Sequence, residues 1–127
     1  MRCRGIRGAT TVNANTKKDI LVATKELLQQ MVSANEVDVE DVACIFFTTT
    51  LDLDAEFPAA AARELGFSQT PLLCGHEMNV PGSLPMCVRI LILFNTEKSA
   101  AEVVHIYIKG AKGLRSGSSD QKGSSGE

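Results

Sequence analysis

The chain has 127 residues, the length of one domain or of one domain with a tail, and its hydrophobic fraction of 44% is enough for a buried core. A net charge of −2 and an aromatic content of 5%, with no Trp, argue against nucleic acid and acidic membranes as partners. No apolar run reaches the length of a membrane span and the N-terminus lacks a signal-peptide core, so we expect a cytoplasmic protein.

Residues 1–12 predict a first strand. Alternation along a strand places Gly5 and Arg7 on one face and Arg4 and Ile6 on the other. Glycines inside a strand permit close approach of a backbone or a ligand. The arginines beside them fit an anion site and a solvated strand end equally well.

A long amphipathic helix follows over residues 17–34. Thr16 is a good N-cap and Asn35 ends the pattern. The apolar stripe at helical spacing comprises Ile20, Leu21, Thr24, Leu27, Leu28, Met31 and Val32. We interpret this stripe as a core face rather than as a cofactor site.

The middle of the chain predicts shorter elements. They are a capped turn at 38–41, a strand at 43–50 and a polar loop at 51–57. Pro58 can begin a short helix that Gly66 ends. Arg63 lies in its last turn, where it either complements the helix dipole or faces a site.

Residues 72–94 contain two apolar runs joined by a connection rich in Pro and Gly. In the second run Cys87, Arg89, Leu91 and Leu93 share one face, and Val88, Ile90, Ile92 and Phe94 share the other. Both faces are apolar apart from Arg89, which predicts a buried strand carrying one guanidinium. A buried cation requires an anion, and Glu77 is the nearest acidic candidate. The pair is either a structural ion pair or part of a site for an anionic ligand.

The C-terminal part predicts a turn through Ala101 and a final strand at 103–109, in which His105 and Tyr107 share a face. From Gly110 onward no periodicity remains, and Gly, Ser and Lys dominate. We expect one folded domain over 1–115 and a flexible tail over 116–127.

The four cysteines form no CxxC pair and lie in or beside apolar runs, which favours reduced core cysteines. A zinc site built from Cys74, His76, Cys87 and His105 would match no standard spacing, so we expect no metal.

These elements predict an α+β fold with about five strands in a mixed sheet, one long amphipathic helix and one short helix. One long helix covers one sheet face and leaves the opposite apolar face exposed. We therefore expect an oligomer.

Six motifs occur in an order that resembles one enzyme family. They are RGIRGATTV at 4–12, FPAAAARELG at 57–66, CGHEM at 74–78, PGSLPMCVR at 81–89, HIY at 105–107 and LR at 114–115. Together they resemble the monofunctional, trimeric chorismate mutase of the mixed α/β, non-helical type, over residues 1–115. The resemblance implies a homotrimer that forms a pseudo-α/β barrel, with active sites in clefts between subunits.

The resemblance also implies roles for individual residues. Arg89 and Glu77 would be catalytic, with Arg89 reaching a carboxylate and the ether oxygen and Glu77 holding the ring hydroxyl. The substrate-binding residues would be Arg7, Phe57, Arg63, Leu73, Cys74, Tyr107 and Arg115. Phe57 and Arg63 would come from the adjacent subunit, and Arg115 would fold over from the tail as a partial lid.

The implied activity is that of an isomerase, the rearrangement of chorismate to prephenate in the shikimate pathway of aromatic amino-acid biosynthesis, with no cofactor. Such a reaction needs conformer selection and electrostatic stabilisation. Two alternatives stay open on the residues alone: a small trimeric imine deaminase and a non-enzymatic regulator that binds a small carboxylate.

Overall fold

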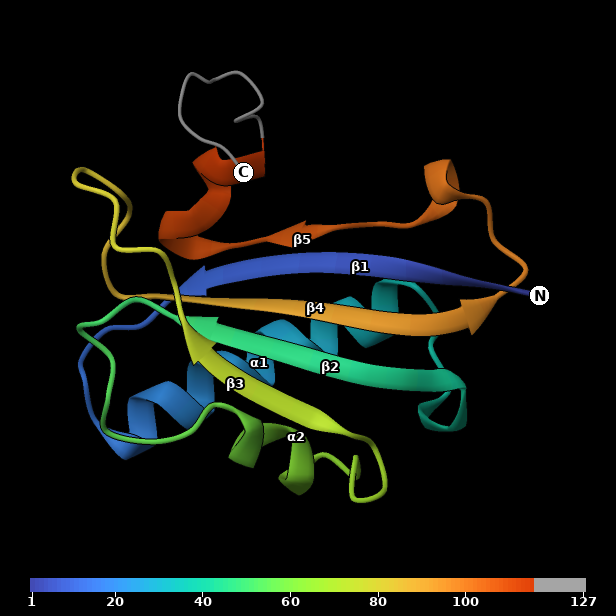
Figure 1. The fold of residues 1–127 in the computed structure, drawn as a ribbon, viewed down its shortest axis with the longest axis horizontal. Coiled ribbons are helices and arrows are strands. Elements are labelled where there is room, and N and C mark those ends of the chain that lie inside the picture. Colours follow the sequence, from blue (N-terminus) through green and yellow to red (C-terminus); the bar gives the residue numbers. More distant parts are fainter. Residues whose placement is uncertain (116–127) are drawn as a thin grey trace.

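In a computed structural model, which describes residues 1–115, the chain forms a five-stranded mixed sheet with one long and one short α-helix (Figure 1). The strands are β1 (Arg2–Thr11), β2 (Val42–Thr49), β3 (Leu72–His76), β4 (Cys87–Thr96) and β5 (Ile106–Tyr107). The helices are α1 (Lys17–Ala34) and α2 (Ala59–Glu64), with 3₁₀-helices η1 (Val39–Asp41), η2 (Ala100–Glu102) and η3 (Lys109–Arg115). The predicted α+β fold is confirmed. No helix in these residues is both long and apolar enough to span a membrane.

The strand order is β3-β2-β4-β1-β5, so the most apolar strand occupies the centre. β4 is antiparallel to β1 and to β2, while the β2–β3 and β1–β5 pairs are parallel. The register places Ala9 and Thr48 on either side of Arg89. Residues that face each other across these pairs lie on the same side of the sheet.

Helix α1 packs against one side of the sheet and forms the core with it (Figure 1). From β4 this core takes Val88, Ile90, Ile92 and Phe94, the face predicted from alternation. A Cβ atom on Gly8 would collide with the Met31 and Leu27 side chains of α1. Glycine at this position therefore lets the helix lie directly against β1.

The helix ends follow the capping signals in the sequence. The Thr16 hydroxyl accepts a hydrogen bond from the backbone N–H of Asp19 at 3.1 Å, and Asn35 is the C-cap of α1. Pro58 precedes α2, and Gly66 follows it with a φ of +100°, the left-handed region that glycine adopts readily.

The last strand is shorter than predicted. The sequence predicts a strand at 103–109, but β5 contains only Ile106 and Tyr107. The cause is the buried side chain of Asn35, whose amide group binds both backbone polar groups of Val104 at 2.8 Å each. Val104 is thereby held by the end of α1 and cannot pair with β1.

Two further differences concern the ends of β5. The predicted turn ends at Ala101, but η2 extends to Glu102, which forms a capping box with the N-cap residue Ser99. After β5, η3 continues to Arg115, although the composition from Gly110 onward predicted no element. Gly110 is fixed there because its N–H donates to the Thr11 hydroxyl at 3.0 Å. The predicted tail at 116–127 lies outside the described residues.

Candidate active site

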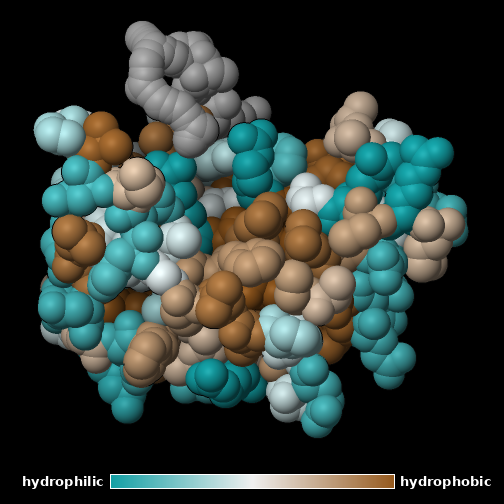
Figure 2. All heavy atoms as spheres, in the orientation of Figure 1, coloured by the Kyte–Doolittle hydropathy of each residue, from teal (hydrophilic) through white to brown (hydrophobic). Residues whose placement is uncertain are grey.

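Among residues 1–115, no α-helix covers the side of the sheet opposite α1. Figure 2 views this side and shows hydrophobic residues gathered over the central strands, with hydrophilic residues around them. Phe46 of β2 is exposed there, and Leu91 and Leu93 of β4 are half-buried. The side chains of Leu91 and Leu93 lie 3.3 and 3.4 Å, respectively, from the position that a Cβ on Gly5 would take. The centre of this open face is therefore apolar.

Two arginines interrupt this apolar surface. Arg7 of β1 and Arg89 of β4 line the same cavity of about 290 Å³, together with Thr48 of β2 and Tyr107 of β5. The neighbouring apolar wall comes from Gly8, Phe46, Ile90 and Leu91. Two guanidinium groups in one largely apolar hollow suit a ligand that carries carboxylates.

An ion pair holds one of these arginines. The Arg89 Nε atom lies 3.4 Å from Oε2 of Glu77, and both side chains are mostly shielded from solvent. Oε2 of Glu77 also accepts a hydrogen bond from the Thr48 hydroxyl, and the Glu77 backbone N–H donates to the Thr49 carbonyl at 2.8 Å. Both sequence interpretations of the Arg89–Glu77 pair are thus compatible, because the paired cation also lines the cavity.

Cys87 lies two residues before Arg89 on β4 and interacts with it. It is fully buried with Ala9 and Ala111, and Leu84, Tyr107 and Leu114 pack on this cluster. Burial raises the pKa of the Cys87 thiol to about 11, outweighing the opposing effect of the nearby Arg89 charge. The thiol is therefore protonated at neutral pH and unsuited to nucleophilic attack.

His105 contacts the backbone at Arg7. Its Nδ1 atom accepts a hydrogen bond from the Arg7 N–H at 3.0 Å. Burial, and secondarily the charge of Arg7, lower the pKa of His105 below its ordinary value of 6.5. The ring is therefore neutral at pH 7, as an acceptor nitrogen requires.

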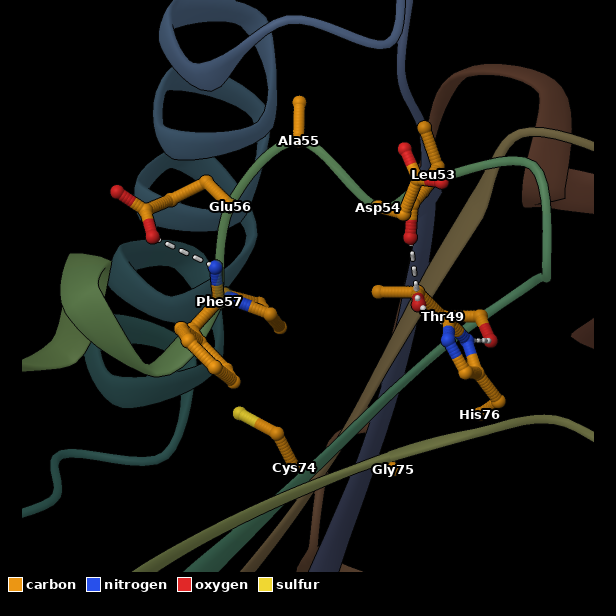
Figure 3. Close-up of a pocket in the computed structure, with 10 residues that line it drawn as sticks. Thr49, Leu53, Asp54, Ala55, Glu56, Phe57, Cys74, Gly75 and His76 are labelled. Carbon is orange, nitrogen blue, oxygen red and sulfur yellow. Dashed lines mark hydrogen bonds between the residues drawn. The ribbon is translucent and has the colours of Figure 1, made fainter.

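A second cavity, of about 340 Å³, lies on the other side of β3, beside the loop that leads into α2. Figure 3 shows the Cys74 sulfur pointing toward Phe57, with Thr49 and His76 at the opposite end of the cavity. The Phe57 side chain is 69% exposed. Burial raises the pKa of Cys74, while a backbone hydrogen bond at Ala59 and the charge of Arg63 oppose the rise.

Within one chain, the predicted site residues therefore lie in two separate groups. Arg7, Arg89, Glu77 and Tyr107 lie together on the open face. Phe57, Cys74 and the nearby Arg63 lie at the β3 edge instead. Leu73 is 62% exposed on β3, and the side chain of Arg115 is outside the described part of the chain.

Sequence reasoning missed Thr48 as a site residue, and it considered His105 only as a strand residue and a possible zinc ligand, not as a partner of Arg7. Thr48 is one of three consecutive threonines, and only the pairing register shows which of them lies beside Arg89. The His105 contact joins residues that are 98 positions apart. Neither contact has a local signal in the sequence.

Among residues 1–115, no group of three or more His, Cys, Asp or Glu side chains is arranged to hold a metal ion. The cysteines and histidines considered as zinc ligands are thus not brought together there.

Comparisons with known proteins agree on one family. The family model described as chorismate mutase type I matches residues 3–118. The chain is 47% identical over 113 residues to the chorismate mutase AroH of Thermus thermophilus, covering 88% of this chain and 93% of that protein. It is 40% identical over 116 residues to AroH of Bacillus subtilis (strain 168), covering 91% of each. A solved chorismate mutase from Clostridium thermocellum superposes with a TM-score of 0.84 at 46% identity, covering 85% of this chain and 96% of that one.

Proposed function

Because this chain belongs to the type I chorismate mutase family, we propose that it is an isomerase that rearranges chorismate to prephenate. The observation that carries the residue assignment is the cavity shared by Arg7 and Arg89 on the open face. Family membership removes the imine deaminase alternative. The pathway follows from the reaction, which supplies aromatic amino-acid biosynthesis, and we propose a cytoplasmic location.

The chemistry of chorismate determines what such a site must provide. The substrate carries two carboxylates, a hydroxyl and an enolpyruvyl ether, and its rearrangement is intramolecular, with no acid, base or nucleophile required. The site must select the compact conformer and stabilise the negative charge that develops on the ether oxygen as the C–O bond breaks. An arginine that reaches this oxygen meets the second need.

We assign roles on this basis. Arg7 binds one substrate carboxylate. Arg89 serves a carboxylate and the ether oxygen together, because its planar fork presents donors in two directions. Glu77, held by the Thr48 hydroxyl and by Arg89, accepts a hydrogen bond from the ring hydroxyl and stabilises the positive charge that develops on the ring. Tyr107 lines the same cavity.

The remaining residues enter from a neighbouring copy. Phe57, Cys74 and Arg63 cluster at the β3 edge, apart from the Arg7–Arg89 cavity, and Leu73 is exposed near them. If the β3 edge of one subunit packs on the open face of the next, both groups surround one ligand. Head-to-tail packing closes into a ring when the rotation between neighbouring subunits permits it, and we propose that it closes here as a homotrimer.

The role of Arg115 follows from the family resemblance and from the position of its backbone. Its backbone ends η3, and the adjacent Leu114 packs beside Tyr107 and Cys87. The chain therefore passes close to the cavity just before Arg115. We propose that Arg115 contacts bound substrate from this position.

The direct test is the loss of chorismate absorbance and the formation of prephenate after addition of purified protein. We expect saturable turnover, and its absence from an Arg89→Ala protein purified in the same way would exclude a contaminating enzyme. Tight binding of chorismate without turnover would contradict the proposal and support the carboxylate-binding regulator.

A further inference from the structure

The edge of β1 next to β5 contains a hydrogen bond that does not belong to the sheet. In the parallel β1–β5 ladder Ala9 pairs with Tyr107, and the Ile108 N–H donates to the Ala9 carbonyl at 3.1 Å. Arg7 lies two residues before Ala9, so its N–H points toward the same neighbour. Continuing the ladder would bring the Val104 carbonyl to this N–H.

The Val104 carbonyl is engaged elsewhere. It accepts a hydrogen bond from the Asn35 side chain at 2.8 Å, and the Val104 N–H donates to the same side chain at 2.8 Å. The Asn35 amide is buried and is held by a third hydrogen bond, to the Met31 carbonyl at 2.9 Å. The segment before β5 is therefore bound to the end of α1, and the Arg7 N–H needs another acceptor.

His105 supplies it. Its Nδ1 atom lies 3.0 Å from the Arg7 nitrogen, so the imidazole takes the place of the backbone carbonyl. An acceptor Nδ1 requires a neutral ring with its proton on Nε2, and the lowered pKa of His105 provides that form at pH 7. In a protonated ring, the Nδ1–H of His105 would point at the Arg7 N–H, so neither group could accept a hydrogen bond. The ring would also place a second positive charge beside Arg7.

We infer that His105 is a positioning residue that fixes the β1 backbone at Arg7 and so directs the Arg7 side chain into the cavity shared with Arg89 and Tyr107. This inference rests on the role assigned to Arg7 in the proposed function. His105 belongs to the segment that leads directly into Tyr107, so one hydrogen bond aligns two walls of the cavity.

The test compares two variants of His105 at pH 7.5. Asn places its Oδ1 atom where the imidazole has Nδ1 and can accept the same hydrogen bond, whereas Leu cannot. We expect His105→Leu to raise KM for chorismate by roughly three- to tenfold, the effect of one lost hydrogen bond, with a smaller change in kcat. His105→Asn should keep KM near that of the unmodified protein. Val104→Ala is the matched control, since its exposed side chain can be shortened while both backbone contacts with Asn35 stay.

A double-mutant cycle separates positioning from general packing. If His105 acts through Arg7, His105→Leu should change KM little once Arg7→Ala has removed the guanidinium. Additive effects, or an Asn variant as impaired as the Leu variant, would overturn the inference. Should the Leu variant fail to fold, His105→Ala takes its place in both comparisons. Unchanged kinetics for Arg7→Ala alone would instead refute the assignment of Arg7 in the proposed function.

Discussion

Arg89 is the residue on which the proposed mechanism depends most. Its Nε lies near Glu77 while the side chain lines the cavity, so the guanidinium is oriented before any ligand arrives. Such preorganised donors stabilise a transition state without reorganising during the reaction. A lysine at this position would keep the charge but would lose the planar fork.

We expect Arg89→Lys to lower kcat by roughly 10²–10³-fold, the usual effect of removing one donor that acts mainly in the transition state. Substrate affinity should fall less, because Arg7 still supplies a cation. Steady-state kinetics with chorismate, together with circular dichroism to confirm folding, provide the measurement. A normal kcat with a raised KM would mean that Arg89 only anchors the ligand.

Thr48 is the support for Glu77. Its hydroxyl donates to the carboxylate oxygen that also faces Arg89. Thr48→Val removes this hydrogen bond at nearly constant shape, and we expect kcat/KM to fall by roughly tenfold. Thr48→Ser keeps the hydroxyl and is the matched control. Equal losses in both variants would show that packing of the Thr48 methyl group, not the orientation of Glu77, is what matters.

At the scale of elements, the sequence was informative wherever the signal was local. Thr16 and Asn35 mark the two ends of α1, whose apolar stripe faces the core. Alternation along β4 distinguishes the buried face of that strand from its open face. A final strand was predicted, but the short length of β5 was not, because that length depends on the Asn35 amide, which lies 69 positions from Val104. A long-range hydrogen bond here outweighs the β propensity of 103–109.

The same Asn35 amide should be a stability determinant. It makes three hydrogen bonds in a buried position, so Asn35→Ala leaves backbone groups of Val104 without a partner and should lower the free energy of unfolding by about 1–3 kcal/mol. Urea denaturation measures this free energy of unfolding. The protein concentration should be the same for both proteins, because assembly would make the midpoint concentration-dependent.

Asn35→Asp is the comparison variant, because it keeps the acceptor for the Val104 N–H and loses the two donors. Its unfolding free energy should lie below that of the unmodified protein. An unchanged midpoint for Asn35→Ala would mean that another group satisfies Val104.

At the scale of the whole molecule, the proposed site between subunits accounts for both the open face and the two separated groups of site residues. Arg89 with Glu77 could be anticipated from the sequence, because a cation in an apolar strand needs a nearby anion. The grouping of Arg7 with Arg89 requires the β1–β4 register, and the separation of Cys74 from both requires the side of β3 on which it lies. Neither is encoded locally.

A site shared between subunits makes a quantitative prediction for mixed oligomers. Arg89→Ala and Arg63→Ala proteins should each be nearly inactive, since Arg89 lies on the open face and Arg63 near the β3 edge. After subunit exchange in equal amounts, an intact site needs Arg89 from one variant and Arg63 from the other. In a head-to-tail ring that combination arises at about a quarter of the sites. Recovered kcat should therefore approach about a quarter of the normal value per site.

The decisive control mixes Arg89→Ala with Arg7→Ala. Both residues line one cavity within a single chain, so every site in these mixed oligomers lacks one of the two guanidinium groups. Activity should stay at the level of the separate variants, even though subunits exchange equally well. Light scattering shows whether a trimer is present, and mass spectrometry of differently labelled subunits shows whether exchange has occurred. Recovery in both mixtures, or in neither after proven exchange, would mean that Arg63 and Arg89 do not meet across a subunit boundary.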